Sequence, residues 1–464
     1  MLSYLHMCYH INKLHAKILC EEGMKKMGAT YKGGVHPYDG KELSMDKPIK
    51  DLLPKGDLVF PLMQHLGKPA KPIVSKGDYV LKGQKIGQAD GFISANVISS
   101  VSGKVKAVEP RLTASGFEVL SVVIENDNEY KTVEGYGVKR DPSQLTKEEI
   151  RSIIEESGIV GLGGASFPTH VKLTPKDDNK IDYFIVNATE CEPYLTNDYR
   201  LMMEEPEKVI GGLKIVLSMF PNAKGIIAIE DNKPKAIELL NKHIEGDSNI
   251  KVHSLDSKYP QGGERQVIYS TTGRETNSSL LPADVGCLVN NVSTIAAIYS
   301  AVADSTPLLT KITTITGDAI REPQNFRVLN GTSMQEVIDA AGGFVTEPEK
   351  IVCGGPMMGY AIYNLDVPVS KYTSGLLCLS TDENAYWEQS ACIHCGRCVD
   401  VCPANLMPQQ MYKFSSRFDE EGFIKIDGLE CIECGCCSYI CPAKIRLTQS
   451  FRETKRSIQR NNSV

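Results

Sequence analysis

Two cysteine-rich stretches near the end of the chain have the spacing of iron–sulfur ligands. They read "CIHCGRCVDVCP" over residues 392–403 and "CIECGCCSYICP" over residues 431–442, and both follow the pattern C-x2-C-x2-C-x3-C-P. Two-residue gaps let three thiolates wrap around one cubane, while the fourth cysteine points away from it. The spacing therefore predicts two neighbouring [4Fe–4S] clusters, which pass electrons singly.

In two-cluster ferredoxins, the fourth cysteine of each run binds the other cluster. This arrangement predicts one cluster held by Cys392, Cys395, Cys398 and Cys441, and a second held by Cys431, Cys434, Cys437 and Cys402. Cys436 is surplus, because using it as the third ligand would change the spacing of its run. A pair of four-cysteine zinc sites is the alternative, but zinc ribbons use two C-x2-C pairs rather than two triplets.

A relay of clusters needs an electron source, and a glycine-rich stretch upstream is the candidate. In "GIVGLGGASFPTHVKL", residues 158–173, Gly161, Gly163 and Gly164 would let backbone N–H groups approach a phosphate or a flat ring closely. Lys172 could neutralise a phosphate or support such a ring. Because the pattern is not a strict G-x-G-x-x-G, a simple tight turn and a solvated lysine are the alternative.

Composition narrows the class of protein. The chain has 464 residues, enough for several domains, and a net charge of −6, which argues against a general affinity for nucleic acid. It contains no run of ~20 consecutive apolar residues of the kind that spans a membrane. Of its 15 cysteines, nine lie between residues 392 and 441, a distribution typical of a reducing cytosol in which thiols bind metal.

The elements that would position these groups follow the sequence pattern. Residues 58–125 alternate short apolar runs with glycine turns, which indicates a small all-β module. Thr146 and Glu149 form a predicted capping box, after which strands and helices alternate and favour a mostly parallel sheet. We expect strands over 182–188, 225–230, 250–255 and 286–291, and helices from about 206, near 233–245, near 263–271 and over 293–303.

Three motifs of this region resemble a known flavoprotein. "GLGGASFPTHVK", "NATECEP" (187–193) and "NNVSTI" (290–295) are similar to the glycine-rich loop, the acidic loop and the asparagine pair of the NADH-binding flavin subunit of respiratory complex I. The resemblance implies FMN contacts from Gly161, Gly163, Gly164, Lys172, Asn187, Glu190, Asn290, Asn291 and Thr294. It implies NADH contacts, and thereby catalytic roles, for Phe167 and Glu192, with Glu264 of "YPQGGERQ" as a further nucleotide contact. The chain departs from that family at Leu162, Ser166, His170, Thr189 and Arg265.

The order of the modules resembles the C subunit of the Rnf electron-transport complex. "YKGGVHPYDGK" (31–41), the β module, the flavin domain, "GGPMMG" (354–359) and the two cysteine runs follow in that order. The implied fold is a multidomain α/β and all-β chain: an N-terminal barrel-sandwich hybrid, a Rossmann-like α/β flavin domain, a β-grasp (SLBB) module and an α-helical two-[4Fe–4S] ferredoxin domain. Around "ISANVISSVSGKV" the sandwich lacks the modifiable lysine of a carrier domain, so we interpret it as structural or as a docking surface.

This resemblance also predicts the domain limits. Residues 1–26 are expected to be an extension that is not native or is disordered. The remaining segments are a sandwich module at 27–135, an FMN/NADH domain at 145–305, an SLBB module at 306–360, a connector at 361–385, a ferredoxin-like domain at 386–450 and a basic tail at 451–464.

The resemblance implies a subunit of a membrane-associated, Na+- or H+-translocating ferredoxin:NAD+ oxidoreductase. Such a subunit exchanges hydride between NAD(H) and FMN and passes single electrons through two clusters. Its expected partners are other Rnf membrane and iron–sulfur subunits, NADH and, indirectly, ferredoxin, with no nucleic acid, on the cytoplasmic face of the cell membrane. A soluble flavin/iron–sulfur reductase, such as a cobalamin reductase, and a non-catalytic wiring scaffold are the alternatives.

Overall fold

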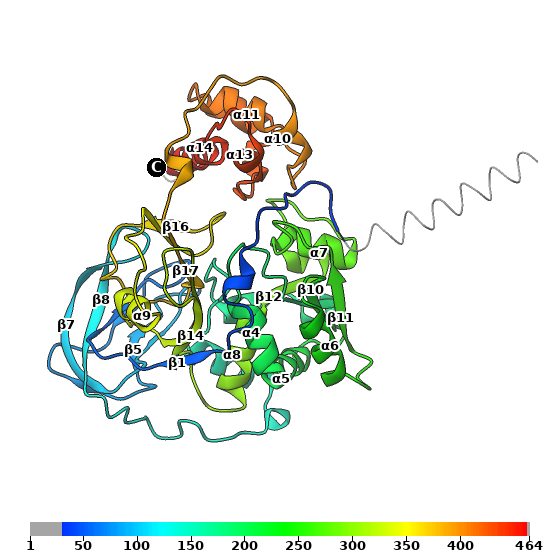
Figure 1. The fold of residues 1–464 in the computed structure, drawn as a ribbon. Coiled ribbons are helices and arrows are strands. Elements are labelled where there is room, and N and C mark those ends of the chain that lie inside the picture. The colour runs from blue at the N-terminus through cyan, green and yellow to red at the C-terminus, as the bar shows by residue number, and fades with distance from the viewer. Residues whose placement is uncertain (1–29, 462–464) are drawn as a thin grey trace, which may run out of the picture.

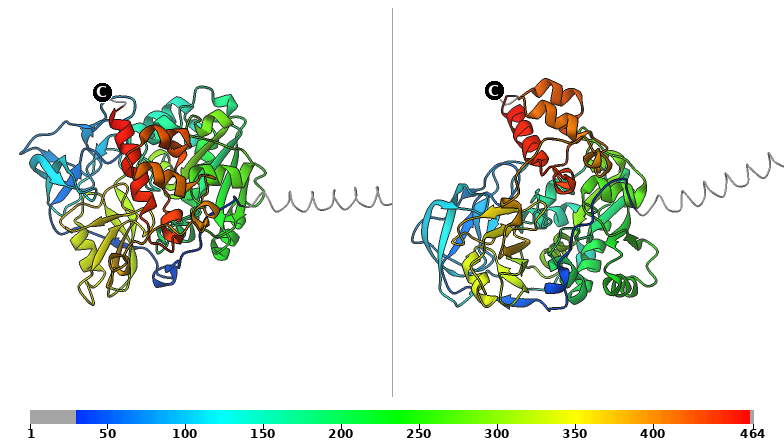
Figure 2. Two further views of the ribbon diagram at one scale, coloured as in Figure 1. Left: turned by 90° about the horizontal axis from the view of Figure 1, so that it is seen from above. Right: turned by 45° about the horizontal axis from the view of Figure 1, so that its top comes forward.

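The computed structural model describes residues 30–461, which form two β-rich bodies, an α/β domain and a helical domain (Figure 1). The predicted extension at 1–26 lies outside these residues. The helical domain lies on the other three, over the side where α7 and β16 are found (Figure 2). No helix within 30–461 is long and apolar enough to cross a membrane.

The N-terminal β module consists of two small sheets, as the glycine-punctuated pattern predicts. One sheet has the order β2-β8-β7-β4 and the other β3-β5-β6. Apolar side chains such as Leu58, Val80 and Val122 fill the space between them. The strands are β2 (Leu58–Pro61), β3 (Lys71–Pro72), β4 (Tyr79–Val80), β5 (Lys85–Gln88), β6 (Val97–Ile98), β7 (Gly103–Leu112) and β8 (Glu118–Asn126).

The α/β domain begins at the predicted capping box. The Thr146 hydroxyl accepts the Glu149 N–H at 3.2 Å, and the Glu149 carboxylate accepts the Thr146 N–H at 2.8 Å. The parallel strands that follow are β9 (Tyr183–Asn187), β10 (Lys224–Glu230), β11 (Ile250–Leu255) and β12 (Cys287–Asn291). The helices are α2 (Lys147–Glu156), α3 (Thr169–Lys172), α4 (Asn197–Glu204), α5 (Pro206–Leu217), α6 (Pro234–His243), α7 (Glu264–Thr272) and α8 (Val292–Val302).

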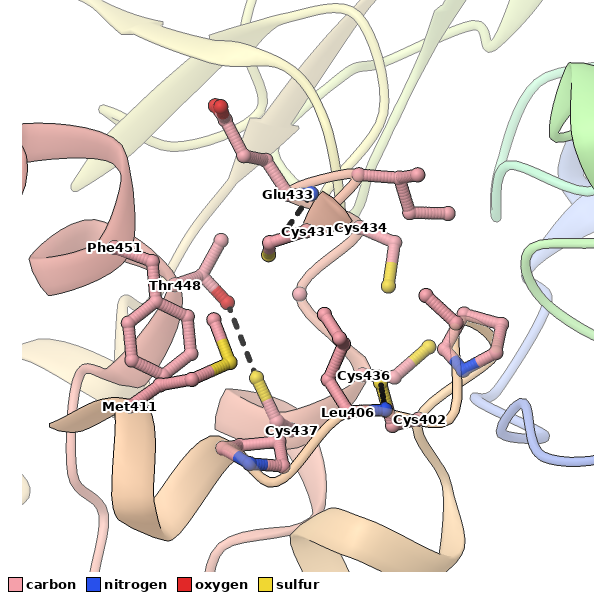
Figure 3. Close-up of a pocket in the computed structure, with 15 residues that line it drawn as sticks. Cys402, Leu406, Met411, Cys431, Glu433, Cys434, Cys436, Cys437, Thr448 and Phe451 are labelled. Atoms are coloured by element: carbon pink, nitrogen blue, oxygen red, sulfur yellow. Dashed lines mark hydrogen bonds between the residues drawn. The ribbon is translucent and has the colours of Figure 1, made fainter. Parts of the chain in front are cut away.

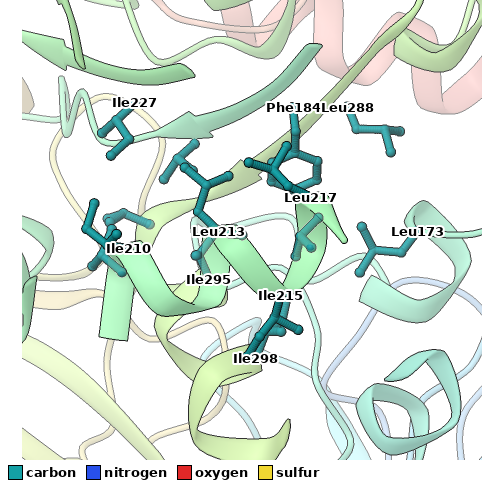
Figure 4. Packing of buried hydrophobic residues seen from close by; sticks show 14 of the residues in the cluster. Leu173, Phe184, Ile210, Leu213, Ile215, Leu217, Ile227, Leu288, Ile295 and Ile298 are labelled. Carbon is teal, nitrogen blue, oxygen red and sulfur yellow. The ribbon is translucent and has the colours of Figure 1, made fainter. Parts of the chain in front are cut away.

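Helices cover both faces of this sheet. Phe184 packs with Leu213 of α5 and Ile295 of α8 on one face (Figure 4). On the other face, Ile185 packs with Val267 of α7. Helices α5 and α8 approach so closely that a Cβ at Gly212 would lie 2.1 Å from the Ile295 carbonyl oxygen. The predicted strands and helices of this domain are therefore present, and α3 and α4 are additional helices.

A six-stranded mixed sheet with the order β1-β14-β13-β17-β15-β16 forms the third body. Its strands are β1 (Lys50–Leu52), β13 (Thr310–Thr316), β14 (Gln324–Leu329), β15 (Lys350–Cys353), β16 (Tyr360–Ile362) and β17 (Gly375–Leu379), and α9 (Met334–Ala340) packs on it. Residues 361–385 are therefore not a plain connector, because β17 lies between β13 and β15. The short buried run Leu376–Cys378 is a strand because it pairs with these distant partners.

The cysteine segment folds into a helical domain with its own apolar core around Met411, Phe423 and Phe451. Its helices are α10 (Arg397–Asp400), α11 (Pro408–Ser415), α12 (Glu420–Lys425), α13 (Cys436–Ile440) and α14 (Leu447–Asn461). The predicted basic tail at 451–464 is thus largely part of α14. Phe451 and Ile458 are buried, because the basic residues of this stretch occupy only the outer face of an amphipathic helix.

Residues 30–52 cross from one body to another. Val35 forms a β-bridge with Tyr259 of the α/β domain, and β1 pairs in parallel with β14 of the mixed sheet. This segment therefore belongs to no single module. Short 3₁₀ helices occur at Lys41–Leu43, Pro142–Gln144, Asp178–Lys180, Pro282–Val285, Glu383–Ala385 and Gly428–Glu430.

Candidate functional site

The parallel sheet of the α/β domain has one point where the strand order reverses. Strands β9, β10 and β11 follow one another in one direction, and β12 adds to the opposite side of β9. Ligands of open α/β sheets bind outside the carboxyl ends of the strands at such a point. Asn187 and Asn291 end β9 and β12 there as direct neighbours, so two of the predicted flavin contacts lie side by side.

The glycine-rich loop lies against this edge. The Leu162 N–H donates to the Thr294 hydroxyl at 2.9 Å, and a Cβ at Gly163 would lie 3.0 Å from the Asn291 Cβ. Gly164 adopts φ +123°, a conformation that other residues rarely reach. Gly163 therefore lets the loop pack against Asn291, and the space beside Gly164, where a Cβ would meet no atom within 4 Å, is open to a ligand.

Asn290 indicates that a polar ligand fits here. Its side chain is 4% exposed at the end of β12, and its Oδ1 has no hydrogen-bond partner. Buried polar atoms are normally paired, so an unpaired acceptor at a ligand-binding edge suits a donor from a bound group. The asparagines and the bare glycine backbone together fit a flat, hydrogen-bonding cofactor such as FMN.

Lys172 has two partners within the protein. Its ammonium donates to the Val289 carbonyl at 2.8 Å and to the Glu264 carboxylate at 2.6 Å. The ion pair joins α3 to the first turn of α7. The structure therefore brings Lys172 and Glu264 together, with the lysine bridging the last strand of the sheet and the helix beside it.

The predicted flavin contact Glu190 has a buried carboxylate that serves α4. Its Oε1 accepts the Asp198 N–H at 2.6 Å, and burial raises the pKa of Glu190 to about 7. Asp198 in turn accepts a hydrogen bond from the Asn291 side chain at 2.6 Å. Glu190 therefore supports the helix whose Asp198 orients Asn291, which places it behind the asparagine pair.

Glu192 and Phe167, the predicted NADH contacts, lie on different loops. One Glu192 oxygen accepts the N–H groups of Met357 and Met358 at 2.6 and 3.2 Å, and burial raises the pKa of Glu192 to about 7. A Cβ at Gly355 would lie 2.1 Å from the Glu192 Cγ. Phe167 is half-buried, and its carbonyl accepts the Gly161 N–H at 2.9 Å. Glu192 thus faces "GGPMMG", and Phe167 closes the glycine-rich loop.

The predicted ligands of the second cluster surround one cavity in the helical domain (Figure 3). Cys402 from the first run lines it together with Cys431, Cys434 and Cys437 from the second run. Leu406 and Glu433 donate backbone N–H groups to the sulfurs of Cys402 and Cys431 at 3.3 and 3.4 Å. Cys436 lines the same cavity. Thiols around an apolar cavity, with N–H donors aimed at two of the sulfurs, fit an iron–sulfur cluster.

The thiols of this cavity need a cation to ionise. Burial raises the pKa of Cys431 to about 11 and that of Cys437 to about 12, whereas ligation deprotonates a thiol. Within residues 30–461 no group of three His, Cys, Asp or Glu side chains is arranged to hold a single metal ion.

Cys436 differs from its neighbours in its partners. It is fully buried, and its sulfur lies 3.7 Å from the Tyr259 carbonyl oxygen, toward which it donates. A hydrogen bond from Cys436 lowers the pKa of Cys434. Cys436 thus lines the cavity with the four predicted ligands and differs from them in its contact with Tyr259.

The predicted ligands of the first cluster are more accessible. Cys392 and Cys395 are exposed, and Cys398 and Cys441 are half-buried on the common helical core. Burial first, and then the neighbouring Cys441 and Cys392, raise the pKa of Cys398. These four cysteines therefore gather at the outer side of the helical domain.

The helical domain is joined to the α/β domain through the second cysteine run. The Tyr259 hydroxyl donates to the Cys434 carbonyl at 2.8 Å, and Arg265 pairs with Glu430 at 2.7 Å. Gly34 donates its N–H to the Val401 carbonyl at 2.9 Å. The second cluster site therefore lies toward the predicted flavin edge, and the first lies away from it.

Sequence reasoning missed the residues of this junction. Tyr259 and Arg265 belong to "YPQGGERQ", and Met357, which packs with Val35 and Cys434, belongs to "GGPMMG". Both motifs stood out in the sequence, but their partners are far away along the chain. Arg265, a departure from the complex I pattern, has Glu430 as its partner.

Comparisons with protein families agree with this architecture. Family models match for the "RnfC Barrel sandwich hybrid domain" at residues 29–129, the "Nuo51 FMN-binding domain" at 154–300, the "SLBB domain" at 312–361 and the "4Fe-4S dicluster domain" at 391–445. The matched order is the order predicted from the sequence.

Curated relatives cover most of the chain. The C subunit of the proton-translocating ferredoxin:NAD(+) oxidoreductase complex of Clostridium ljungdahlii is 47% identical over 82% of this chain and 83% of that protein. The C subunit of the Na(+)-translocating complex of Acetobacterium woodii is 46% identical over 84% and 88%. The C subunit of the ion-translocating oxidoreductase complex of Rhodobacter capsulatus is 40% identical over 92% and 82%.

Proposed function

The chain belongs to the family of C subunits of Rnf ion-translocating ferredoxin:NAD(+) oxidoreductases, and from this premise we propose that it is the subunit that exchanges electrons with NAD(H). When bound, FMN would exchange hydride with the nicotinamide and single electrons with the clusters. Asn187, Asn290, Asn291 and the bare backbone at Gly163 would hold the flavin at the edge of the sheet.

The observation that carries this proposal is the seating of the second cysteine run on the flavin domain. Tyr259 and Arg265 contact Cys434 and Glu430, and Arg265 lies one residue after Glu264, the partner of Lys172. Glu264 and Arg265 are the first two residues of α7, so this helix start contacts both the second cysteine run and Lys172 of the glycine-rich segment. A scaffold without a flavin site would not require this placement.

The exposed first cluster site suits delivery to another protein. Because Cys392 and Cys395 are exposed, a partner can approach that cluster without moving the α/β domain. We assign this face to the other iron–sulfur and membrane subunits of the complex, with the chain bound peripherally at the cytoplasmic side. Ferredoxin would then exchange electrons with the complex indirectly, and the membrane subunits would move Na+ or H+.

Cofactor content and two electron acceptors test the proposal. Full-length protein, prepared without oxygen, should contain about one FMN and about eight iron atoms per chain. It should oxidise NADH with ferricyanide, which takes electrons from flavins directly, and with cytochrome c, a one-electron protein acceptor that would take electrons from the exposed cluster. Protein that carries iron but neither flavin nor NADH oxidation would leave the wiring scaffold as the function.

A further inference from the structure

Two loops of the sandwich module lie on the glycine-rich loop of the flavin domain. The loop at residues 62–70 follows β2, and its Leu66 N–H donates to the Ser166 carbonyl at 3.2 Å. The loop at residues 89–96 follows β5, and its Phe92 ring meets His170 edge-on at 6.4 Å between ring centroids. Ser166 and His170 both belong to "GLGGASFPTHVK". The module therefore touches the flavin domain at the segment predicted to bind a nucleotide.

The second loop is braced at both ends. Asn96 accepts the Ala89 N–H at 2.8 Å and donates to the Glu155 carbonyl of α2 at 3.2 Å. Asp90 pairs with the ammonium groups of Lys68 and Lys71 at 2.5 and 3.1 Å. Because these contacts fix the loop to its neighbours, the tip is held in place before any ligand arrives.

The braced tip presents apolar side chains to solvent. Gly91 adopts φ +111°, and Phe92 after it is 65% exposed, beside Ile93 at 44% and Leu66 at 52%. The His170 ring is nearly perpendicular to the Phe92 ring, and the Phe92 side chain stays largely exposed beside it. An exposed aromatic face beside a nucleotide loop suits the stacking of a base.

We propose that Phe92 stacks on the adenine ring of NAD(H), so that the sandwich module supplies part of the nucleotide site. This inference rests on the proposed function. The nicotinamide must reach the asparagine edge, which Gly163 faces, whereas Ser166 and His170 contact the sandwich module. A dinucleotide that extends from the asparagine edge toward the sandwich module would place its adenine at Phe92.

Steady-state kinetics with two reductants test this assignment. Phe92→Ala should raise the KM for NADH about tenfold with kcat unchanged, since one base stack is lost. Reduced nicotinamide mononucleotide lacks the adenosine half, so its KM should not change. Phe92→Tyr keeps an aromatic ring, so its KM for NADH should equal that of the unsubstituted protein. Phe117→Ala, at a 73% exposed site on the turn between β7 and β8, is the matched control.

The outcomes separate this inference from the function on which it rests. An unchanged KM for NADH in Phe92→Ala overturns the adenine contact while the unsubstituted protein still oxidises NADH. An equal rise in KM for both reductants would place Phe92 at the nicotinamide end and also overturns it. Unsubstituted protein with bound FMN that oxidises neither reductant would disprove the proposed function itself.

Discussion

Glu192 is a carboxyl group enclosed between two domains. It accepts two N–H groups from the loop after β15, yet burial dominates and raises its pKa to about 7. The same loop places Met357 against Cys434. The protonation state of Glu192 is therefore tied to how the mixed sheet, the flavin domain and the second cysteine run fit together.

We expect Glu192 to make folding stability depend on pH. The folded chain holds this proton more tightly than the unfolded chain, so the free energy of unfolding should fall by up to about 3 kcal/mol as pH rises from the ordinary glutamate pKa of 4.5 to about 7. Glu192→Gln should flatten that part of the curve, measured by thermal unfolding in a pH series. Glu421→Gln, whose side chain is 89% exposed, is the control. An identical slope in Glu192→Gln would mean that Glu192 is ionised in the folded protein throughout.

At the scale of elements, the short helix α10 determines that Cys402 lies with the cysteines of the second run. The helix spans Arg397–Asp400 and turns the chain after Cys398, so that Cys402 enters the cavity of the second run. The two cysteine runs therefore contribute thiols to one cavity, although each run contains four cysteines of its own.

Cys402→Ser should damage the cluster of the second run and spare the cluster of the first, and Cys441→Ser should do the reverse. EPR spectra of the reduced proteins, compared with those of Cys431→Ser and Cys392→Ser, distinguish the two signals. Cys402→Ser should match Cys431→Ser, with about four iron atoms lost per chain. If it matches Cys392→Ser instead, each run closes on its own cluster.

Elements with local determinants were predictable, and those with distant partners were not. The capping box at Thr146, the parallel strands and the cysteine runs follow from neighbouring residues. Strands β1 and β17 exist because β14, β13 and β15 pair with them, and short apolar runs do not specify such partners. Likewise, the motifs of the site were visible, but the burial of Glu190 and Glu192 depends on α4 and on the loop after β15.

At the scale of the whole molecule, the helical domain is joined to the flavin domain by a few polar contacts around an apolar patch. Arg265 and Glu430 form an ion pair that is about one-quarter exposed, and Glu430 also accepts the Ser278 N–H at 2.9 Å. These contacts hold the predicted second cluster site against the α/β domain, which carries the predicted flavin site. Their loss should affect electron transfer between the domains more than the chemistry within either one.

Arg265→Glu should therefore slow NADH-dependent reduction of cytochrome c roughly tenfold and leave ferricyanide reduction unchanged. The double variant Arg265→Glu with Glu430→Arg should recover most of the cytochrome c rate. Lys214→Glu serves as the control. Lys214 lies on α5, away from the helical domain, and the substitution removes its ion pair with Asp247 (Figure 1). Equal loss with both acceptors would instead assign Arg265 to nucleotide binding.

The crossing segment at residues 30–52 has a consequence for how the protein is made. Its Gly34 and Val35 bind Val401 and Tyr259, and its β1 pairs with β14, yet a ribosome synthesises this segment long before any of those partners. Domains fold as they emerge during translation, but Gly34 cannot bond to Val401 until the first cysteine run has left the ribosome. Completing the contacts of this segment is thus a late folding step, and a truncated product that lacks the cysteine runs would leave Gly34 without its partner at Val401.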